Sequence, residues 1–185
     1  MIHIQGPYFK DEHGRCLILR GVNLGGSTKV PFHPNGATHI REGFYDHRNV
    51  SSVGRPFPLE EADEHFARLR AWGFTLLRLL VTWEAVEHAG PGIYDQEYLD
   101  YLYQVVRKAS EHGLHLFIDP HQDLWSRMSG GDGAPGWTFE AVGMDVTRFS
   151  EAGATIIHCI HGDPFPRLIW PTNYSKLAAA TMFTL

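Results

Sequence analysis

Two segments of this chain pair an amphipathic helix with an apolar strand, and only one glycine separates the two elements of each pair. The helices are expected at residues 58–72 and 95–112, where apolar side chains recur every three or four positions. A glycine then suits a left-handed cap, and an apolar run typical of a buried strand follows at once. These glycines and strands are Gly73 with residues 74–81 and Gly113 with residues 114–119. The alternation predicts a parallel sheet covered by helices.

The N-terminal part of the chain predicts further strands. Residues 2–9 and 15–20 favour β-structure on either side of an Asp-Glu-His-Gly stretch that suits a tight turn. Residues 17–22 are expected to form a buried strand that leads into the glycine-rich loop 23-NLGGSTK-29. Residues 30–57 follow without a clear period, and a stretch of that length inside a compact chain is usually functional or disordered.

Two architectures fit this order of elements, an open doubly wound sheet and part of a (β/α)8 barrel. The links from helix to strand are single glycines, whereas the links after the strands are long and rich in aromatic and polar residues, as on the ligand-binding rim of a barrel. A doubly wound dinucleotide-binding sheet has a GxGxxG turn that leads directly into a helix, and 21-GVNLGG-26 lacks that spacing. We therefore predict an α/β fold for residues 1–185, the N-terminal part of a (β/α)8 TIM barrel with about three βα units.

Composition and charge argue against several classes of protein. The formal net charge is -5 and no run of Lys or Arg is present, which argues against nucleic acid as a partner. The two cysteines lie outside any CxxC pair, and no apolar run reaches the roughly 20 residues of a transmembrane segment. The N-terminus lacks the pattern of a signal peptide, which predicts a cytoplasmic location. Residues 176–185 resemble a helix without a stop signal, so we expect an interrupted sequence.

Polar and aromatic side chains are expected to gather where the strands end, because the carboxyl ends of parallel strands meet at one rim. Lys29 follows the first of these strands, Arg78 lies in the second, and His121 and Asp123 follow the third, with Trp125 close behind. This set offers hydrogen-bond donors, acceptors and flat apolar faces, as a small-ligand pocket requires. Sugars combine hydroxyl groups with apolar C–H faces and therefore suit such a pocket.

Each of these residues also has a structural interpretation. Arg78 has two leucines on either side and needs a carboxylate if it is buried, so it either holds a catalytic carboxylate or forms a structural ion pair. His121 and Asp123 can instead cap the following helix or bond loop backbone. Trp137 and Trp170 are either sugar platforms or ordinary packing residues.

Other kinds of site have less support. Two pairs of histidines lack the carboxylate and helix context of a zinc enzyme, so no metal site is expected. These pairs are His112 with His115 and His158 with His161. Glu84 and Glu87 resemble a catalytic carboxylate pair, but they are expected to bond backbone or face solvent. No GxSxG elbow, P-loop or HExxH motif is present.

Several blocks of sequence resemble one known family. The blocks are 19-LRGVNLGG-26, 78-RLLVTWEAVE-87, 90-GPGIYDQEYLDYLYQVV-106, 116-LFIDPHQD-123, 133-GAPGW-137 and 161-HGDPFPRLIWPTNYSKLAAATMF-183. Together they resemble glycoside hydrolase family 5, and within it the endoglycoceramidase-related branch that contains fungal glucosylceramide and steryl-glucoside β-glucosidases. The resemblance extends over essentially all 185 residues.

The resemblance implies a (β/α)8 barrel and retaining hydrolysis by two glutamates without a cofactor. Arg78 matches the arginine that orients the nucleophile, and His121 and Asp123 match residues that contact the sugar. Lys29 matches a sugar-contacting lysine after strand one, and Trp170 is a further candidate for the same pocket. The implied ligand is a β-glucoside of a lipid, either ceramide or a sterol. Because the family has vacuolar members, the expected location is cytoplasmic or vacuolar.

The sequence departs from the family pattern in one respect. It contains no Asn-Glu pair, and only three barrel strands precede its end, whereas such a barrel needs about 250 residues. Both catalytic glutamates are therefore expected beyond Leu185, in a remainder of the barrel that is missing here, and the 185-residue fragment is expected to be inactive. The alternative is a non-catalytic carbohydrate- or glycolipid-binding α/β module.

Overall fold

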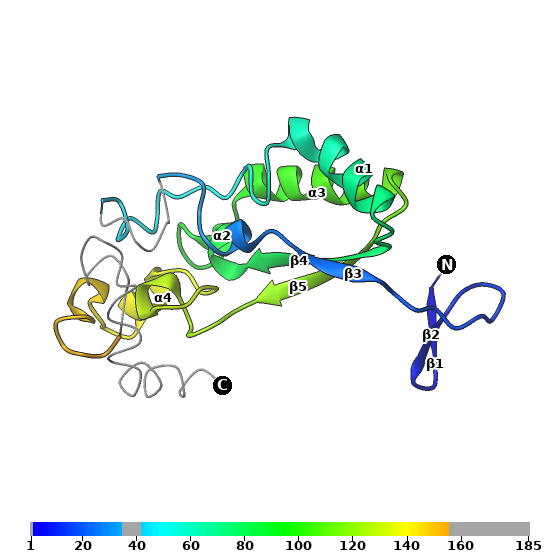
Figure 1. The fold of residues 1–185 in the computed structure, drawn as a ribbon. Coiled ribbons are helices and arrows are strands. Elements are labelled where there is room, and N and C mark those ends of the chain that lie inside the picture. The colour runs from blue at the N-terminus through cyan, green and yellow to red at the C-terminus, as the bar shows by residue number, and fades with distance from the viewer. Residues whose placement is uncertain (1, 35–41, 156–185) are drawn as a thin grey trace, which may run out of the picture.

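Three parallel strands form the central sheet of the computed structural model, which describes residues 2–34 and 42–155. The strands lie in the order β3–β4–β5, and helices α1 and α3 cover one face of the sheet (Figure 1). The bounds of these elements are β3 Gly21–Leu24, α1 Ala62–Ala71, β4 Leu76–Thr82, α3 Gln96–Glu111 and β5 His115–His121. The structure confirms the predicted α/β fold, with parallel strands joined through helices as in the first part of a (β/α)8 barrel.

Both predicted helices form, and the local sequence explains where they begin and end. A short 3-10 turn, η2 (Leu59–Glu61), leads into α1. Asp95 caps α3, because its carboxylate accepts a hydrogen bond of 2.9 Å from the backbone nitrogen of Tyr98. Gly73 and Gly113 follow the two helices with φ values of 87° and 68°, a conformation that glycine adopts readily. The chain therefore turns from each helix into the next strand within a few residues.

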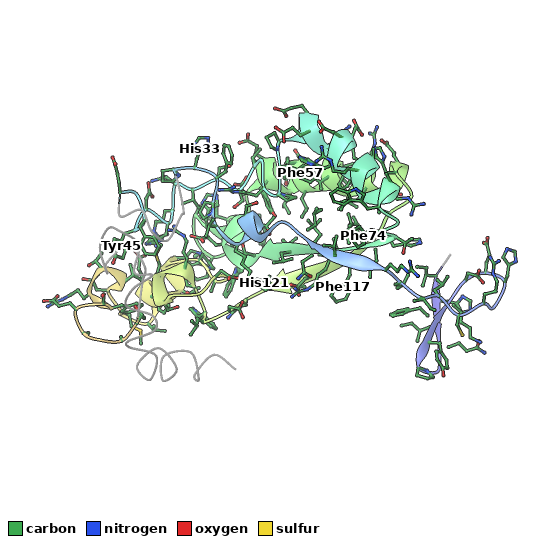
Figure 2. All side chains as sticks on the ribbon, in the orientation of Figure 1. His33, Tyr45, Phe57, Phe74, Phe117 and His121 are labelled. Carbon is green, nitrogen blue, oxygen red and sulfur yellow. The ribbon has the colours of Figure 1, made fainter. Side chains whose placement is uncertain are left out.

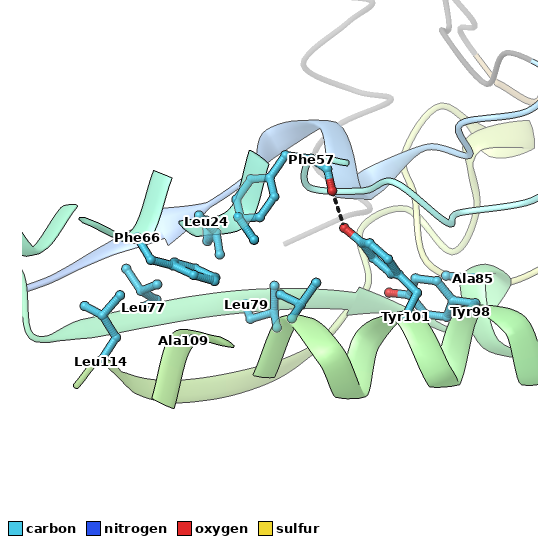
Figure 3. Close-up of a cluster of buried hydrophobic side chains, with 12 residues drawn as sticks. Leu24, Phe57, Phe66, Leu77, Leu79, Ala85, Tyr98, Tyr101, Ala109 and Leu114 are labelled. Atoms are coloured by element: carbon cyan, nitrogen blue, oxygen red, sulfur yellow. Dashed lines mark hydrogen bonds between the residues drawn. The ribbon is translucent and has the colours of Figure 1, made fainter. Parts of the chain in front are cut away.

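The hydrophobic core lies between the sheet and the two helices (Figure 3). The central strand β4 contributes Leu77 and Leu79, and α1 contributes Phe66, each at most 1% exposed. Tyr101 of α3 is also buried, and its hydroxyl group donates a hydrogen bond to the backbone oxygen of Phe57. Burial of each large apolar side chain contributes about 1.5–3 kcal/mol to the stability of the fold. The core thereby packs both helices against the sheet.

Residues 3–10 form a hairpin rather than a single strand. Strands β1 and β2 pair antiparallel and project away from the central sheet (Figure 1). Their bounds are His3–Gln5 and Tyr8–Lys10. The predicted Asp-Glu-His-Gly turn follows them, since the backbone nitrogen of Gly14 donates to the carbonyl oxygen of Asp11 at 3.0 Å.

The prediction of a buried strand at residues 17–22 is wrong in its position. The strand that pairs with β4 is β3, which begins four residues later than predicted and ends two residues later, and Ile18 remains 87% exposed. The apolar character of this run indicated a strand, but pairing begins only where Gly21 meets Leu76. A side chain at Gly21 would lie 2.9 Å from the carbonyl oxygen of Leu76, so this close approach requires glycine.

The remaining helices are short and lie in the connections that follow the strands. They are η1 Gly26–Lys29, α2 Trp83–Glu87, η3 Arg127–Ser129, α4 Trp137–Ala141 and η4 Val146–Arg148. A second cluster of buried residues, Phe44, Met128 and Val146, joins the connection after β3 to the connection after β5. The described part of residues 30–57 is therefore packed against the rest of the chain. Within residues 2–34 and 42–155, every helix is too short or too polar to cross a lipid bilayer.

Candidate functional site

Arg78, Asp119 and His121 are bonded to one another on strands β4 and β5. The Nη2 atom of Arg78 lies 2.7 Å from Oδ2 of Asp119, and Nδ1 of His121 lies 2.8 Å from the same oxygen. Arg78 also donates from Nη1 to the side-chain oxygen of Asn23 at 3.3 Å, across the β3–β4 pair. One carboxylate thus orients both a guanidinium and an imidazole group.

These side chains lie on the face of the sheet that the helices leave open. Arg78 alternates along β4 with two leucines that are buried beneath the helices, so it points the other way. Its partner across β4–β5 is Phe117, which points away from the helices and is 57% exposed (Figure 2). The side chain of Arg78 is 37% exposed, and it has in Asp119 the carboxylate partner that a buried arginine would need. Sequence reasoning missed Asp119, although its spacing of two from His121 places both on one face of a strand.

Lys29, Asp123 and Asp132 adjoin His121 and extend this group. The Nζ atom of Lys29 lies 3.1 Å from Oδ2 of Asp123 and 3.3 Å from Oδ2 of Asp132. The Nε2 atom of His121 lies 3.3 Å from Oδ2 of Asp123 and 3.4 Å from Oδ1 of Asp132. The structure thus brings together four residues singled out from the sequence. We call the whole set the polar cluster: Lys29, Arg78, Asp119, His121, Asp123 and Asp132.

Asp132 is a member of the polar cluster that sequence reasoning missed. It pairs with Asp123 through two backbone hydrogen bonds of 2.9 and 2.8 Å, which fold the loop after β5 back on itself. Gly131 makes this approach possible, because a Cβ atom there would lie only 2.0 Å from the carbonyl oxygen of Asp123. The available signal was the Gly-Gly-Asp-Gly turn at residues 130–133, which follows the His-Gln-Asp stretch by only a few residues.

The charged groups of the polar cluster shift one another's pKa values in opposite directions. Burial raises the pKa of Asp132, and the attraction of Lys29 and His121 offsets this only in part. Burial also acts to raise the pKa of Asp123, but the hydrogen bonds and the attraction from Lys29 and His121 together outweigh it, and the pKa is lowered. Burial acts to lower the pKa of Lys29, but the two carboxylates outweigh it and the pKa is raised. The cluster therefore offers both donors and acceptors to a ligand.

Two atoms of the polar cluster are buried without a hydrogen bond of good geometry among the described residues. They are Nε2 of His121 and Oδ1 of Asp132. Their separation of 3.4 Å satisfies an ion-pair distance but not the angles of a hydrogen bond, so we regard them as incompletely bonded. A hydroxyl group or a water molecule, which both donates and accepts, would satisfy both atoms, and because they are shielded from solvent it would have to enter between His121 and Asp132.

Donor atoms of His121, Asp123 and Asp132 lie within 4.8 Å of one another, as metal ligands do. The ammonium group of Lys29, however, already bonds both carboxylates and supplies the compensating positive charge. A metal ion would have to displace Lys29, so this arrangement suits a polar organic ligand better than a metal.

Glu84 differs from its prediction, because it is buried rather than bonded to backbone or exposed to solvent. It is 3% exposed and accepts from Nε of Arg127, itself 1% exposed, at 2.9 and 3.0 Å. The second glutamate, Glu87, does accept from a backbone nitrogen, that of Gly92. The Glu84–Arg127 pair joins the connection after β4 to the connection after β5. It therefore fixes the loop that carries Asp132 to the connection after β4.

A cavity of about 500 Å³ lies elsewhere on the molecule, beside α3. Phe32, Leu59 and Tyr101 are among its lining residues, and no member of the polar cluster lines it. It therefore plays no part in the site. Trp170, His158 and His161 lie outside the described residues, so the predictions that concern them stay predictions.

Comparison with known proteins identifies the family. The model of the family described as Cellulase (glycosyl hydrolase family 5) matches residues 37–154. The chain belongs to glycosyl hydrolase family 5. This membership confirms the resemblance found in the sequence, and the matched residues include every member of the polar cluster except Lys29.

Within family 5 the chain is similar to fungal enzymes named for lipid glucosides. It is 56% identical over 190 residues to the glucosylceramidase of Rhizopus delemar, covering 100% of this chain and 28% of that protein. It is 41% identical over 203 residues to the ergosteryl-beta-glucosidase of Saccharomyces cerevisiae, covering 100% of this chain and 27% of that protein.

A solved family 5 structure has the same fold over nearly the whole chain. The crystal structure of Cryptococcus neoformans sterylglucosidase 1 matches with a TM-score of 0.84 and 45% identity, covering 98% of this chain and 26% of that one. The chain therefore spans about a quarter of the length of the relatives that it matches.

Proposed function

We propose that this chain forms the N-terminal part of a retaining β-glycosidase that hydrolyses a β-glucoside of a lipid, either glucosylceramide or a steryl glucoside. The observation that supports it most is the polar cluster, which joins residues of three adjacent parallel strands and their loops in a family 5 chain. The names of the relatives supply the class of substrate.

The proposed roles follow from the family resemblance and from the partial exposure of Lys29, Arg78 and Asp123. Lys29, His121 and Asp123 bond hydroxyl groups of the glucose, with Asp132 as a buried support for the first two. Arg78 is held by Asp119 and aims its guanidinium at the carboxylate of the nucleophile. The nucleophile and the general acid/base are glutamates outside residues 1–185, and their carboxyl groups lie about 5–5.5 Å apart in a retaining enzyme.

Activity assays of the complete polypeptide that contains this chain test the proposal. We expect it to release glucose from glucosylceramide or a steryl glucoside, and we expect residues 1–185 alone to release none. The variants Lys29→Met and Asp123→Asn should each lower kcat/KM by roughly 10- to 100-fold, because hydrogen bonds to charged groups are worth about 1.5–3 kcal/mol.

Lys10→Met is the matched control, since Lys10 lies on the projecting hairpin and should leave kcat/KM unchanged. Turnover of a β-glucoside by residues 1–185, or full activity of the Lys29 and Asp123 variants, would contradict the proposal.

The alternative, a non-catalytic binding module, gains support from one observation. All members of the polar cluster lie within the described residues and make their contacts with one another. Isothermal titration of residues 1–185 with methyl β-glucoside distinguishes the two functions. Specific binding by residues 1–185, combined with a complete polypeptide that has no hydrolytic activity, would favour the binding module.

A further inference from the structure

The cavity of about 500 Å³ beside α3 lies where helices α1 and α3 begin. Its walls come from three segments: the first turns of α3, the short helix η2, and the connection after β3. Helix α1 follows β3 and α3 follows β4, so the two helices are neighbours on one face of the sheet (Figure 1). The lining residues all lie between Phe32 and Gln104, and the volume is in the range of small-molecule sites, about 300–1,000 Å³. The cavity is therefore a candidate binding site separate from the polar cluster.

The interior of this cavity is mainly hydrocarbon. Phe32 lines it and is 40% exposed, and Val53 and Leu59, which also line it, are partly buried. Tyr101 of α3 is a further lining residue, but its hydroxyl group is already bonded to the backbone oxygen of Phe57 (Figure 3). A ligand therefore meets the ring of Tyr101 rather than a free hydroxyl group. An apolar body fits this interior, since its burial there removes hydrocarbon on both sides from water.

The wall that carries Phe32 is held in place by contacts within the protein. The backbone nitrogen of Phe32 donates to the carbonyl oxygen of Ser51 at 2.7 Å, and His33 and Ser51 exchange two backbone hydrogen bonds of 3.1 and 3.0 Å. The guanidinium group of Arg55 packs over the ring of Phe32, with 5.2 Å between Cζ and the ring centroid. Arg55 itself does not line the cavity. The wall is thus preformed, which lowers the entropic cost of binding a ligand.

Three carboxylates line the cavity, those of Glu60, Glu97 and Asp100, whereas no lysine, arginine or histidine lines it. Asp100 accepts a hydrogen bond of 2.8 Å from the neutral side chain of Gln96. Among the described residues, neither Glu60 nor Glu97 has a cationic side chain as an ion-pair partner. Both lie in first turns, of η2 and α3, and the N-terminal end of a helix tolerates unpaired negative charge. The cavity thus combines an apolar interior with a surplus of negative charge.

We propose that this cavity binds an organic cation with an apolar body, of the class of primary alkylammonium ions. The hydrocarbon chain packs against Phe32, Leu59 and Tyr101, and the ammonium group meets the carboxylates of Glu60 and Glu97. An anion of the same shape would face three carboxylates without a cation to offset them, and a sugar would bring hydroxyl groups against hydrocarbon. The charge and the lining therefore favour a cationic amphiphile over both. The site shares no residue with the polar cluster and does not depend on the proposed function.

Isothermal titration of the complete polypeptide tests the site with three probes. We expect n-octylammonium to bind with a Kd below about 1 mM. Octanoate has a chain of similar length with the opposite charge, and ethylammonium has the same head group with almost no chain. Each of these two should therefore bind at least about tenfold more weakly than n-octylammonium. Added NaCl should weaken the binding of n-octylammonium, because salt screens exposed charges.

Substitutions in the complete polypeptide locate the bound cation. The double variant Glu60→Gln/Glu97→Gln should weaken n-octylammonium binding about fivefold, because two attractive charges are lost. Gln104→Trp places a large ring in the cavity and should weaken binding more than about tenfold. Glu111→Gln and Tyr103→Trp are the matched controls, since they make similar changes on α3 outside the cavity and should leave the affinity unchanged.

Hydrogen exchange of the wild-type polypeptide does not depend on whether the variants fold. Saturating n-octylammonium should slow amide exchange in peptides that contain residues 51–60 and 97–104, which include most of the cavity wall. Exchange in residues 115–133, which carry most of the polar cluster, should not change.

Failure of the wild-type polypeptide to bind n-octylammonium would overturn the proposal and leave Glu60 and Glu97 with a role at their helix ends alone. Binding of octanoate as tight as that of n-octylammonium would overturn it too. So would equal effects of Gln104→Trp and Tyr103→Trp, or slower exchange confined to residues 115–133.

Discussion

The buried pair of Glu84 and Arg127 allows a sharp prediction about the loops of the site. Arg127 donates from Nε to both carboxylate oxygens of Glu84, from Nη1 to the backbone oxygen of Phe44, and from Nη2 to that of Asp46 at 2.7 Å. One side chain therefore joins the connections after β3, β4 and β5. Arg127→Met removes all four hydrogen bonds and leaves the carboxylate of Glu84 without its cation.

The magnitude follows from the burial of both groups, which are 1% and 3% exposed. Removing one partner of a buried ion pair costs about 3–5 kcal/mol, because the other charge stays away from water. A tenfold change in an equilibrium corresponds to about 1.4 kcal/mol, so local opening of these loops should increase by at least about 100-fold. Hydrogen exchange followed by mass spectrometry measures this in the complete polypeptide, in peptides that contain residues 44–46 and 126–133.

Arg107→Met is the matched control. Arg107 also donates from Nε to a glutamate, Glu111, at 2.9 Å, but both side chains are more than half exposed. An exposed pair of this kind contributes about 0–1 kcal/mol, so exchange near Arg107 should change less than tenfold. If amide hydrogen exchange in these loops is as slow in Arg127→Met as in the wild type, the inference that the Glu84–Arg127 pair holds the loops together is wrong.

The pH dependence of the Arg127→Met variant provides an independent check. Burial raises the pKa of Glu84 even with Arg127 present, and without Arg127 it should be higher still. A carboxyl group with a raised pKa in the folded state favours folding below its unfolded pKa and disfavours it as the pH rises through the folded pKa. The variant should therefore be closest to the wild type near pH 5 and most destabilised near pH 8. The double variant Glu84→Gln/Arg127→Met should lack this pH dependence.

Two further predictions concern α3 and the loop of the site. Burial raises the pKa of Tyr101 to about 12, so its contribution to stability should be complete below about pH 10 and decline as the pH rises toward 12. Tyr101→Phe should lower the free energy of unfolding by about 1 kcal/mol at pH 8, because the hydrogen bond to Phe57 is lost. Between pH 10 and 12 the variant should lose less of this free energy than the wild type, as measured by urea unfolding. Parallel curves of unfolding free energy against pH would contradict the prediction. Gly131→Ala should lower kcat/KM for the lipid glucoside more than tenfold, because the new methyl group meets the backbone of Asp123. In Gly143→Ala the methyl group meets open space, and the φ of 77° adds only backbone strain of about 1 kcal/mol, so this variant should retain activity. Equal activity of both variants would refute the argument.

Local patterns in the sequence predicted the parts of the fold that depend on neighbouring residues. The three- and four-residue periodicity predicted both long helices, and the single glycines marked where α1 and α3 give way to strands. Each of these features is decided by residues within a few positions of one another. The pairing of β3 was misplaced because the partner of a strand lies some fifty residues away, on β4.

Part of the polar cluster was also predictable, because side chains at the ends of parallel strands converge. Lys29, Arg78, His121 and Asp123 were selected on that ground, and they lie together. Asp119 was missed although it lies in a predicted strand.

The sequence by itself determined the alternation of helices and strands, the family, and which polar residues follow the strands. Only the tertiary structure decided that Asp119 joins Arg78 to His121, that Asp132 folds back onto Lys29, and that Glu84 lies buried against Arg127. The physical reason is that a charged side chain has no fixed environment in the sequence. Whether it is solvated, paired or buried depends on which distant segment the packing of the core and the turns of the loops bring against it.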